Sequence, residues 1–313
     1  MTQALPRCSD AARTRGDAPV GTGAPVARWL LVEHPGPWLR DAVASSGIAH
    51  SILDQMRSAA SAVGGRVLLI RRPGRREASG VRSWAVVDSL RPATAPVWGA
   101  WERDRDLLEA VLVLRGGLPD GRRADLPGRP AGGAVDPILL VCAHGRHDVC
   151  CAVRGRPVAA ALQARWPNDT WECSHVGGDR FAANVVVLPD GVFYGNLDET
   201  TAIAAVEAHL RGTTAVEHLR GLSTEPPVAQ VAVAAALTRW APSHPRSFRS
   251  TSVRQEAPNL WTVHLAGTSP LPDVVATVVT SARPPARLTC AALRETAAMA
   301  YEVASLAVDP GPG

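Results

Sequence analysis

Residues 142–151 (CAHGRHDVCC) and 171–181 (WECSHVGGDRF) contain four of the six cysteines of this chain. A short apolar run at 137–141 (PILLV) predicts a strand that ends at Cys142, and residues 169–175 predict a second strand. Clustered cysteines without a disulfide framework indicate metal binding or redox chemistry. We therefore expect two loops, each at the carboxyl end of a strand, to converge on one bound centre.

The residues after these loops predict regular elements. Pro157 lies near the start of an expected helix at 157–165, because proline suits the first helical turn. Residues 181–188 and 192–197 flank the turn sequence Pro-Asp-Gly and predict a hairpin. A helix is expected at 199–210. The class that this pattern indicates is α/β.

Composition limits the function classes that need to be considered. The 313 residues are 46% apolar and 20% charged, which is ordinary for a globular protein. No run reaches the roughly 18 to 20 apolar residues that a membrane helix needs, and the N-terminus has no apolar signal segment. All cationic side chains are arginines, and a net charge of +4 is weak evidence for nucleic acid. We expect a cytoplasmic protein with no nucleic-acid or membrane partner.

Small and basic residues beside the cysteines fit an iron–sulfur centre. A 2Fe–2S cluster takes four protein ligands, usually thiolates and in some proteins imidazoles. Gly145, Gly177 and Gly178 would let backbone N–H groups approach the cluster sulfides. Arg146 and Arg180, if near a cluster, would offset its negative charge and favour the reduced state.

At these residues the chain resembles the sucrase/ferredoxin-like family. The resemblance covers residues 137–198: Cys-x-His-Gly-x-x-Asp at a strand end, a cysteine nine positions after the first, Ser-His-x-Gly-Gly, Arg-Phe and Leu-Pro-x-Gly-x-x-Tyr-Gly. It implies a thioredoxin-like ferredoxin module with one 2Fe–2S cluster. Such a protein would exchange single electrons with a redox partner protein, as a carrier more than as a catalyst.

Carried over position by position, the resemblance assigns Cys142, Cys151 and His175 as three ligands. In relatives that use two histidines, the second follows the first by four positions, where this chain has Asp179. Cys173 is the alternative, because residues 173 and 175 of an extended strand share a face. A carboxylate oxygen is a harder donor than thiolate or imidazole. The fourth ligand stays open between Cys173 and Asp179.

The other cysteines and histidines have simpler interpretations. His144 and His147 are interpreted as polar loop residues, and Cys150 as either a small buried residue or an alternative ligand. Cys8 and Cys290 have no neighbouring cysteine in the sequence. We interpret Cys290 as a buried thiol, since free cysteines are commonly buried.

The predicted elements and the composition of the segments between them indicate the domain organisation. The order strand, helix, strand, strand, helix before the linker resembles a degenerate thioredoxin-like half, but it has no cysteine for a cluster. A final amphipathic helix is expected at 289–306. We predict five parts: a flexible arm (1–26), a thioredoxin-like domain without ligands (27–115), a Gly- and Pro-rich linker (116–134), the thioredoxin-like ferredoxin domain (135–222) and a small α+β region (223–313).

Two other functions compete with electron transfer. A structural zinc site could use Cys142, Cys151, Cys173 and His175, but the step of nine positions is long for structural zinc, whose paired ligands lie roughly two to four residues apart. A thiol oxidoreductase expects Cys-x-x-Cys at a helix N-terminus, and this sequence has none. No paired carboxylates indicate sugar hydrolysis.

Overall fold

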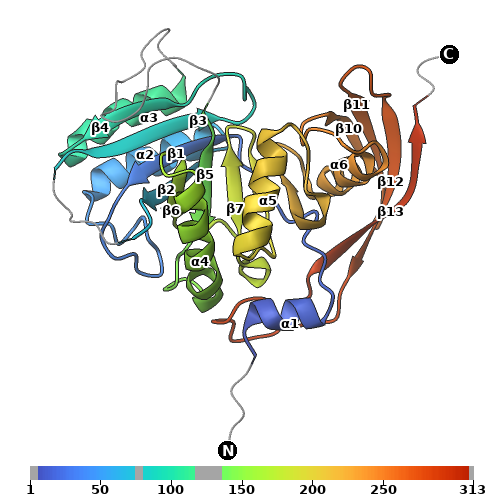
Figure 1. Cartoon of the computed structure of the whole chain (residues 1–313), viewed down its shortest axis with the longest axis horizontal. Helices are drawn as coiled ribbons and strands as arrows, with labels where there is room; N and C mark the ends of the chain where they lie inside the picture. Colours follow the sequence, from blue (N-terminus) through green and yellow to red (C-terminus); the bar gives the residue numbers. More distant parts are fainter. Residues whose placement is uncertain (1–5, 75–79, 117–135, 310–313) are drawn as a thin grey trace, which may run out of the picture. The chain divides into compact units, whose positions relative to one another are not determined.

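The described residues, 6–74, 80–116 and 136–309 of this computed structural model, divide into two units (Figure 1). The sheet unit consists of residues 25–176 and 185–191. The C-terminal unit consists of residues 1–24, 177–184 and 192–313. The fold is mixed α/β, and each unit is described by itself below.

The sheet unit is built on one mixed sheet. Its strand order is β4-β3-β1-β2-β6-β5-β7. The pairs β1–β2 and β5–β6 are parallel, whereas β1–β3, β3–β4, β5–β7 and β2–β6 are antiparallel. The strands are β1 (Arg28–Glu33), β2 (Arg66–Arg71), β3 (Arg82–Asp88), β4 (Val97–Trp101), β5 (Ile138–Cys142), β6 (Thr170–Cys173) and β7 (Val185–Leu188).

Helices of the sheet unit pack on this sheet. They are α2 (His50–Ala62), the short 3-10 helix η1 (Asp104–Asp106), α3 (Leu107–Arg115) and α4 (Val149–Arg165). Ile52, Met56 and Ala60 are buried on one face of α2, as their four-residue spacing predicts. They pack in one core with Leu30 of β1 and Leu114 of α3. The same core contains Leu69 of β2 and Val86 of β3.

Helix α4 starts earlier than the sequence analysis expects. Asp148 is its N-cap, and its Oδ1 accepts the Cys150 N–H at 2.8 Å. Pro157 therefore lies inside the helix rather than near its first turn. The predicted polar loop from Cys142 ends at Asp148, and Cys150 and Cys151 lie in the first helical turn.

The C-terminal unit contains a second sheet. Strands β10 to β13 pair antiparallel in chain order, and α6 packs against them. No helix among the described residues of the chain could cross a lipid bilayer. The elements of this unit are α1 (Cys8–Thr14), η2 (Asp179–Phe181), β8 (Val192–Tyr194), α5 (Glu199–Leu210), η3 (Val216–His218), β9 (Leu219–Leu222), α6 (Pro227–Arg239), β10 (Phe248–Ala257), β11 (Leu260–Gly267), β12 (Val274–Ala282) and β13 (Met299–Val308).

Two expectations for the chain ends are wrong. Residues 1–5 lie outside the described part, but the rest of the predicted flexible arm contains α1, in which Cys8 and Ala12 are buried. The Arg13 side chain also donates a hydrogen bond to the Ala182 carbonyl at 3.2 Å. The helix expected at 289–306 does not form: residues 289–298 are irregular, and β13 follows, because its pairing with β12 outweighs the helix propensity of its alanines.

The two units differ from the predicted domain boundaries. Strands β2 and β6 pair through Ile70 with Cys173 and Arg71 with Glu172, so the segments 27–115 and 135–176 share one sheet. Gly116 is the only described residue of the predicted linker, and 117–134 lie outside the described residues. The predicted α+β region after residue 222 is part of a larger unit that starts at the N-terminus.

Candidate metal centre

Three residues from three segments of the sheet unit meet at one place. Cys142 is the last residue of β5, Cys151 lies in the first turn of α4, and His175 follows β6. One ligand atom from each lies within 4.8 Å of the others. Both cysteines are buried and His175 is half-buried. These are the three residues that the resemblance implies as ligands.

Parallel strand pairing brings the two loops together. Cys142 of β5 pairs with Cys173 of β6, and the Ala143 N–H donates to the Cys173 carbonyl at 3.2 Å. The carboxyl ends of both strands therefore lie at the same edge of the sheet. Beyond that edge, Ser174 is fixed to β2: its N–H donates to the Leu69 carbonyl at 2.8 Å, and its Oγ accepts the Leu69 N–H at 3.0 Å.

Cys173 lies beside Cys142 but outside the group of three in the described part of the chain. From the sequence, residues 173 and 175 are expected to share one face of a strand. However, β6 ends at Cys173, and His175 lies beyond the strand. Burial raises the pKa of the Cys173 thiol well above its ordinary value, and Cys142 raises it further. Both effects favour the neutral thiol at position 173.

His144 holds the backbone of His175. Its Nε2 lies 2.6 Å from the Leu39 carbonyl oxygen, and its Nδ1 lies 3.3 Å from the His175 backbone nitrogen. One tautomer satisfies both contacts: Nε2–H donates to the carbonyl, and Nδ1 accepts the amide hydrogen. Burial lowers the pKa of His144, which favours this neutral form. His144 is therefore a positioning residue.

His147 contacts His175 directly. The two rings are stacked, with centroids 3.6 Å apart and an interplanar angle of 20°. The Nδ1 of His147 lies 3.3 Å from the Arg40 carbonyl oxygen. From the sequence we interpret His147 as a polar loop residue, and in the structure its ring contacts the candidate ligand His175.

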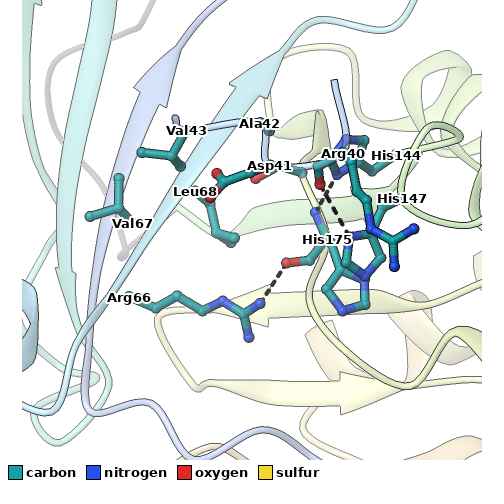
Figure 2. A pocket seen from close by; sticks show the side chains of 11 residues that line it. Arg40, Asp41, Ala42, Val43, Arg66, Val67, Leu68, His144, His147 and His175 are labelled. Carbon is teal, nitrogen blue, oxygen red and sulfur yellow. Dashed lines mark hydrogen bonds between the residues drawn. The ribbon is translucent and has the colours of Figure 1, made fainter. Parts of the chain in front are cut away.

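A cavity of about 470 Å³ lies beside these histidines (Figure 2). Arg66 lines it and donates from Nη2 to the His175 carbonyl at 2.7 Å. Burial lowers the pKa of Arg66, while the thiols of Cys173 and Cys142 act in the opposite direction. The lining comes from three segments: Arg40, Asp41, Ala42 and Val43; Arg66, Val67 and Leu68; and His144, His147, Ser174 and His175.

The sequence gives no signal for Arg66. Arg66 and His175 are 109 positions apart, and Arg66 reaches His175 only because β2 and β6 pair. His147 carries a weak signal, since it stands between the two cysteine ligands implied by the resemblance. That signal alone does not separate it from an ordinary turn histidine.

Four further predicted site residues, at positions 177–180, belong to the C-terminal unit. Gly177 and Gly178 have φ of 88° and 74°, and a Cβ on Gly178 would lie 2.2 Å from the Arg220 Nη2. The backbone conformation thus explains glycine at both positions, whether or not a cluster is bound nearby. Asp179 is buried in η2.

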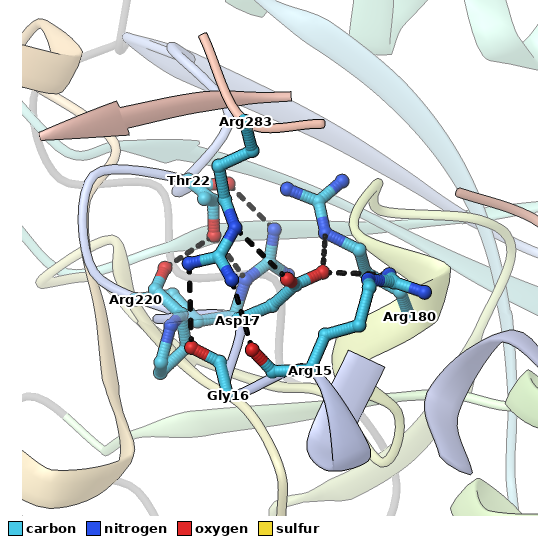
Figure 3. A network of polar contacts seen from close by, with 8 residues as sticks. Arg15, Gly16, Asp17, Thr22, Arg180, Arg220 and Arg283 are labelled. Carbon is cyan, nitrogen blue, oxygen red and sulfur yellow. Dashed lines mark hydrogen bonds and ion pairs between the residues drawn. The ribbon is translucent and has the colours of Figure 1, made fainter. Parts of the chain in front are cut away.

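Arg180 contacts a buried carboxylate in the C-terminal unit (Figure 3). Its Nε lies 3.6 Å from Asp17, which also pairs with Arg15 at 2.7 Å and with Arg283 at 3.3 Å. Burial lowers the pKa of Arg180, and Asp17 opposes that shift. The structure therefore gives Arg180 a structural ion pair; its predicted role at a cofactor remains a prediction.

The two cysteines outside the cluster motif are neighbours in space. The Cys8 N–H donates to the Sγ of Cys290 at 3.4 Å, although the residues are 282 positions apart. The fold thus brings together two cysteines that have no neighbouring cysteine in the sequence. Cys290 is half-buried, whereas Cys150 is fully buried in α4 as expected.

Two thiols and an imidazole gathered at the edge of a mixed sheet define a candidate metal-binding protein of the α/β class. A model of the sucrase/ferredoxin-like family matches residues 19–221. The chain belongs to the sucrase/ferredoxin-like family, as its motifs suggest. It matches none of the curated proteins and none of the solved structures with which it was compared.

Proposed function

We propose that this chain binds one 2Fe–2S cluster through Cys142, Cys151 and His175, and exchanges single electrons with a partner protein. The observation that carries this proposal is the meeting of these three donors within 4.8 Å. Thiolate and imidazole are the protein donors that 2Fe–2S clusters accept, and membership of the family supports iron–sulfur chemistry over other metal sites.

The surrounding residues suit a centre that gains negative charge on reduction. Cys151 lies at the N-terminal end of α4, where the helix dipole favours negative charge. Arg66 adds a positive charge near Cys142. His175 is half-buried beside the cavity and offers a path for an electron to reach a partner. When bound, the cluster would supply one-electron chemistry.

We also infer a thioredoxin-like fold for the sheet unit, from an internal repeat. Strand β1, helix α2, parallel strand β2 and antiparallel strand β3 are repeated by β5, α4, β6 and β7. The equivalent strands β2 and β6 pair antiparallel, as a local two-fold relation between the repeats requires. The first repeat continues with β4 and α3, which completes the order expected of a thioredoxin-like half.

Metal analysis of the full chain tests the proposed function. Protein purified without oxygen is expected to contain about two irons per chain and to absorb at roughly 400–500 nm. Chemical reduction should produce an electron paramagnetic resonance signal. Cys142→Ser should abolish all three properties, because it removes one thiolate.

Cys290→Ser is the matched control, since it removes a thiol in the other unit, and it should keep the iron and the spectrum. Stoichiometric zinc without iron in the wild-type protein would refute the proposal in favour of a zinc site. A Cys142→Ser protein with full iron content would refute the assigned ligand.

A further inference from the structure

The imidazole rings of His147 and His175 are stacked, and backbone contacts fix both residues. Their ring centroids are 3.6 Å apart, and each offers a nitrogen within 4.8 Å of the other. The backbone N–H of His147 donates to the His144 carbonyl at 3.1 Å, and the His175 N–H contacts the His144 Nδ1. Arg66 fixes the His175 carbonyl. Both rings are therefore positioned by backbone contacts.

The orientation of the His147 ring suits a ligand. Its Nδ1 faces the Arg40 carbonyl, which only accepts hydrogen bonds, so Nδ1 carries the hydrogen and Nε2 carries the lone pair. Metal-bound histidines almost always donate their other ring N–H to a carbonyl or carboxylate in this way. The contact with Arg40 thus fixes both the tautomer and the ring direction.

The place of His147 in the chain also fits. It lies in the turn that joins Cys142 to Cys151, so the segment that carries both thiols carries this imidazole as well. Its neighbour Asp148 caps α4 and links the position of the turn to the position of Cys151. His175 belongs to both sets of contacts: one of its nitrogens lies within 4.8 Å of both sulfurs, and a His175 nitrogen also lies within 4.8 Å of a His147 nitrogen.

The competing donors are less suitable. Among the described residues, Cys173 belongs neither to the group of Cys142, Cys151 and His175 nor to the group that brings His147 to His175. His144 uses both nitrogens in contacts with Leu39 and His175. The carboxylate of Asp179 is a hard oxygen donor, whereas iron in a cluster with sulfide ligands prefers thiolate or imidazole.

We infer that His147 is the fourth ligand, so that two thiolates and two imidazoles bind the cluster. This inference rests on the proposed function and specifies its ligand set. Each imidazole is neutral where a thiolate is anionic, so the centre carries less negative charge than one bound by four cysteines. A higher reduction potential follows.

The test counts the nitrogens bound to iron in the reduced full-length protein. With ¹⁵N-labelled histidine, pulsed electron paramagnetic resonance should detect two strongly coupled nitrogens in the wild type. His147→Asn should lose one coupling or the whole cluster. His50→Asn, at an exposed histidine of the same unit, is the matched control and should keep both couplings.

His147→Cys separates loss of a ligand from loss of the fold. A thiolate at this position should restore about two irons per chain. It should leave one coupled nitrogen and lower the reduction potential relative to wild type. A His147→Cys protein that keeps two coupled histidine nitrogens would overturn the inference.

Asp179→Asn tests the competing oxygen ligand. We expect this variant to keep both nitrogen couplings and its iron. If it loses the cluster while His147→Asn keeps iron and an unchanged spectrum, Asp179 is the ligand and the inference is wrong. In that case the wild type still contains iron, so this failure differs from failure of the proposed function, in which no iron is bound.

Discussion

At the scale of single residues, Arg66 connects the charge and the geometry of the candidate centre. It donates to the His175 carbonyl at 2.7 Å and lies near the thiols that act on its pKa. A guanidinium stays protonated even where burial lowers its pKa. Arg66 therefore brings a permanent positive charge to a site that would become more negative if the proposed cluster accepted an electron.

Arg66→Gln is expected to lower the reduction potential of the cluster. The loss of one positive charge at close range destabilises the reduced state, by on the order of tens of millivolts. Redox titration of the visible spectrum measures the shift. Arg57→Gln removes an exposed arginine of α2 and should leave the potential unchanged. Equal potentials for Arg66→Gln and wild type would contradict this role.

At the scale of elements, the first turn of α4 positions Cys151. The cap of Asp148 on the Cys150 N–H starts the helix one residue after the cap. Gly155 lets the same helix approach β5, because a Cβ there would lie 2.1 Å from the Cys142 carbonyl oxygen. Strand β5 and helix α4 are thus held close together, each carrying one thiol.

Asp148→Ala is expected to reduce both stability and iron content. Loss of an N-cap costs about 1 kcal/mol, and fraying of the first turn displaces Cys151. Asp198→Ala is the control, because Asp198 caps α5 through the Thr201 N–H at 2.8 Å. It should cost a similar free energy of unfolding and keep its iron. Denaturant unfolding and iron analysis measure both, and equal iron contents would contradict the role of the cap.

The sequence predicts some elements better than others for identifiable reasons. Helix α5 has its predicted bounds, because local apolar patterns and end signals agree there. The start of α4 differs from its prediction because Pro157 resembles a helix start signal, whereas the helix begins after the Asp148 cap. The strand β13 is encoded by good helix formers, so only its pairing with β12 reveals it.

At the scale of the whole molecule, the sequence predicts the three donor residues but not the other residues that line the neighbouring cavity. Cys142, Cys151 and His175 come together as the motifs imply, since they lie at neighbouring strand ends. The contribution of residues 40–43 and 66–68 depends on pairing between distant strands. Local sequence patterns do not predict pairing between distant strands, so the sequence does not identify Arg66 as a site residue.

The pH dependence of unfolding is a whole-molecule property to which Glu225 contributes. Burial raises the pKa of this carboxyl above its value in the unfolded chain, although hydrogen bonds from Ser250 oppose the shift. A raised pKa means that the native state binds more protons, so this contribution is present below the unfolded pKa. It is lost as the pH rises through the native pKa.

Glu225→Gln should therefore weaken the fall in stability as the pH rises above the unfolded pKa of a glutamate, which is about 4.3. Denaturant unfolding across this range gives the free energy of unfolding at each pH. The wild-type protein, unfolded over the same pH range, is the reference. A Glu225→Gln slope equal to that of wild type would contradict the assignment.

The pairing of β2 with β6 joins the two halves of the sheet unit edge to edge. Arg66 and residues 40–43 belong to the half of the sheet unit that has none of the three donors, and they line the cavity beside those donors. A substitution in the first half can therefore alter the surroundings of the candidate centre without changing any donor.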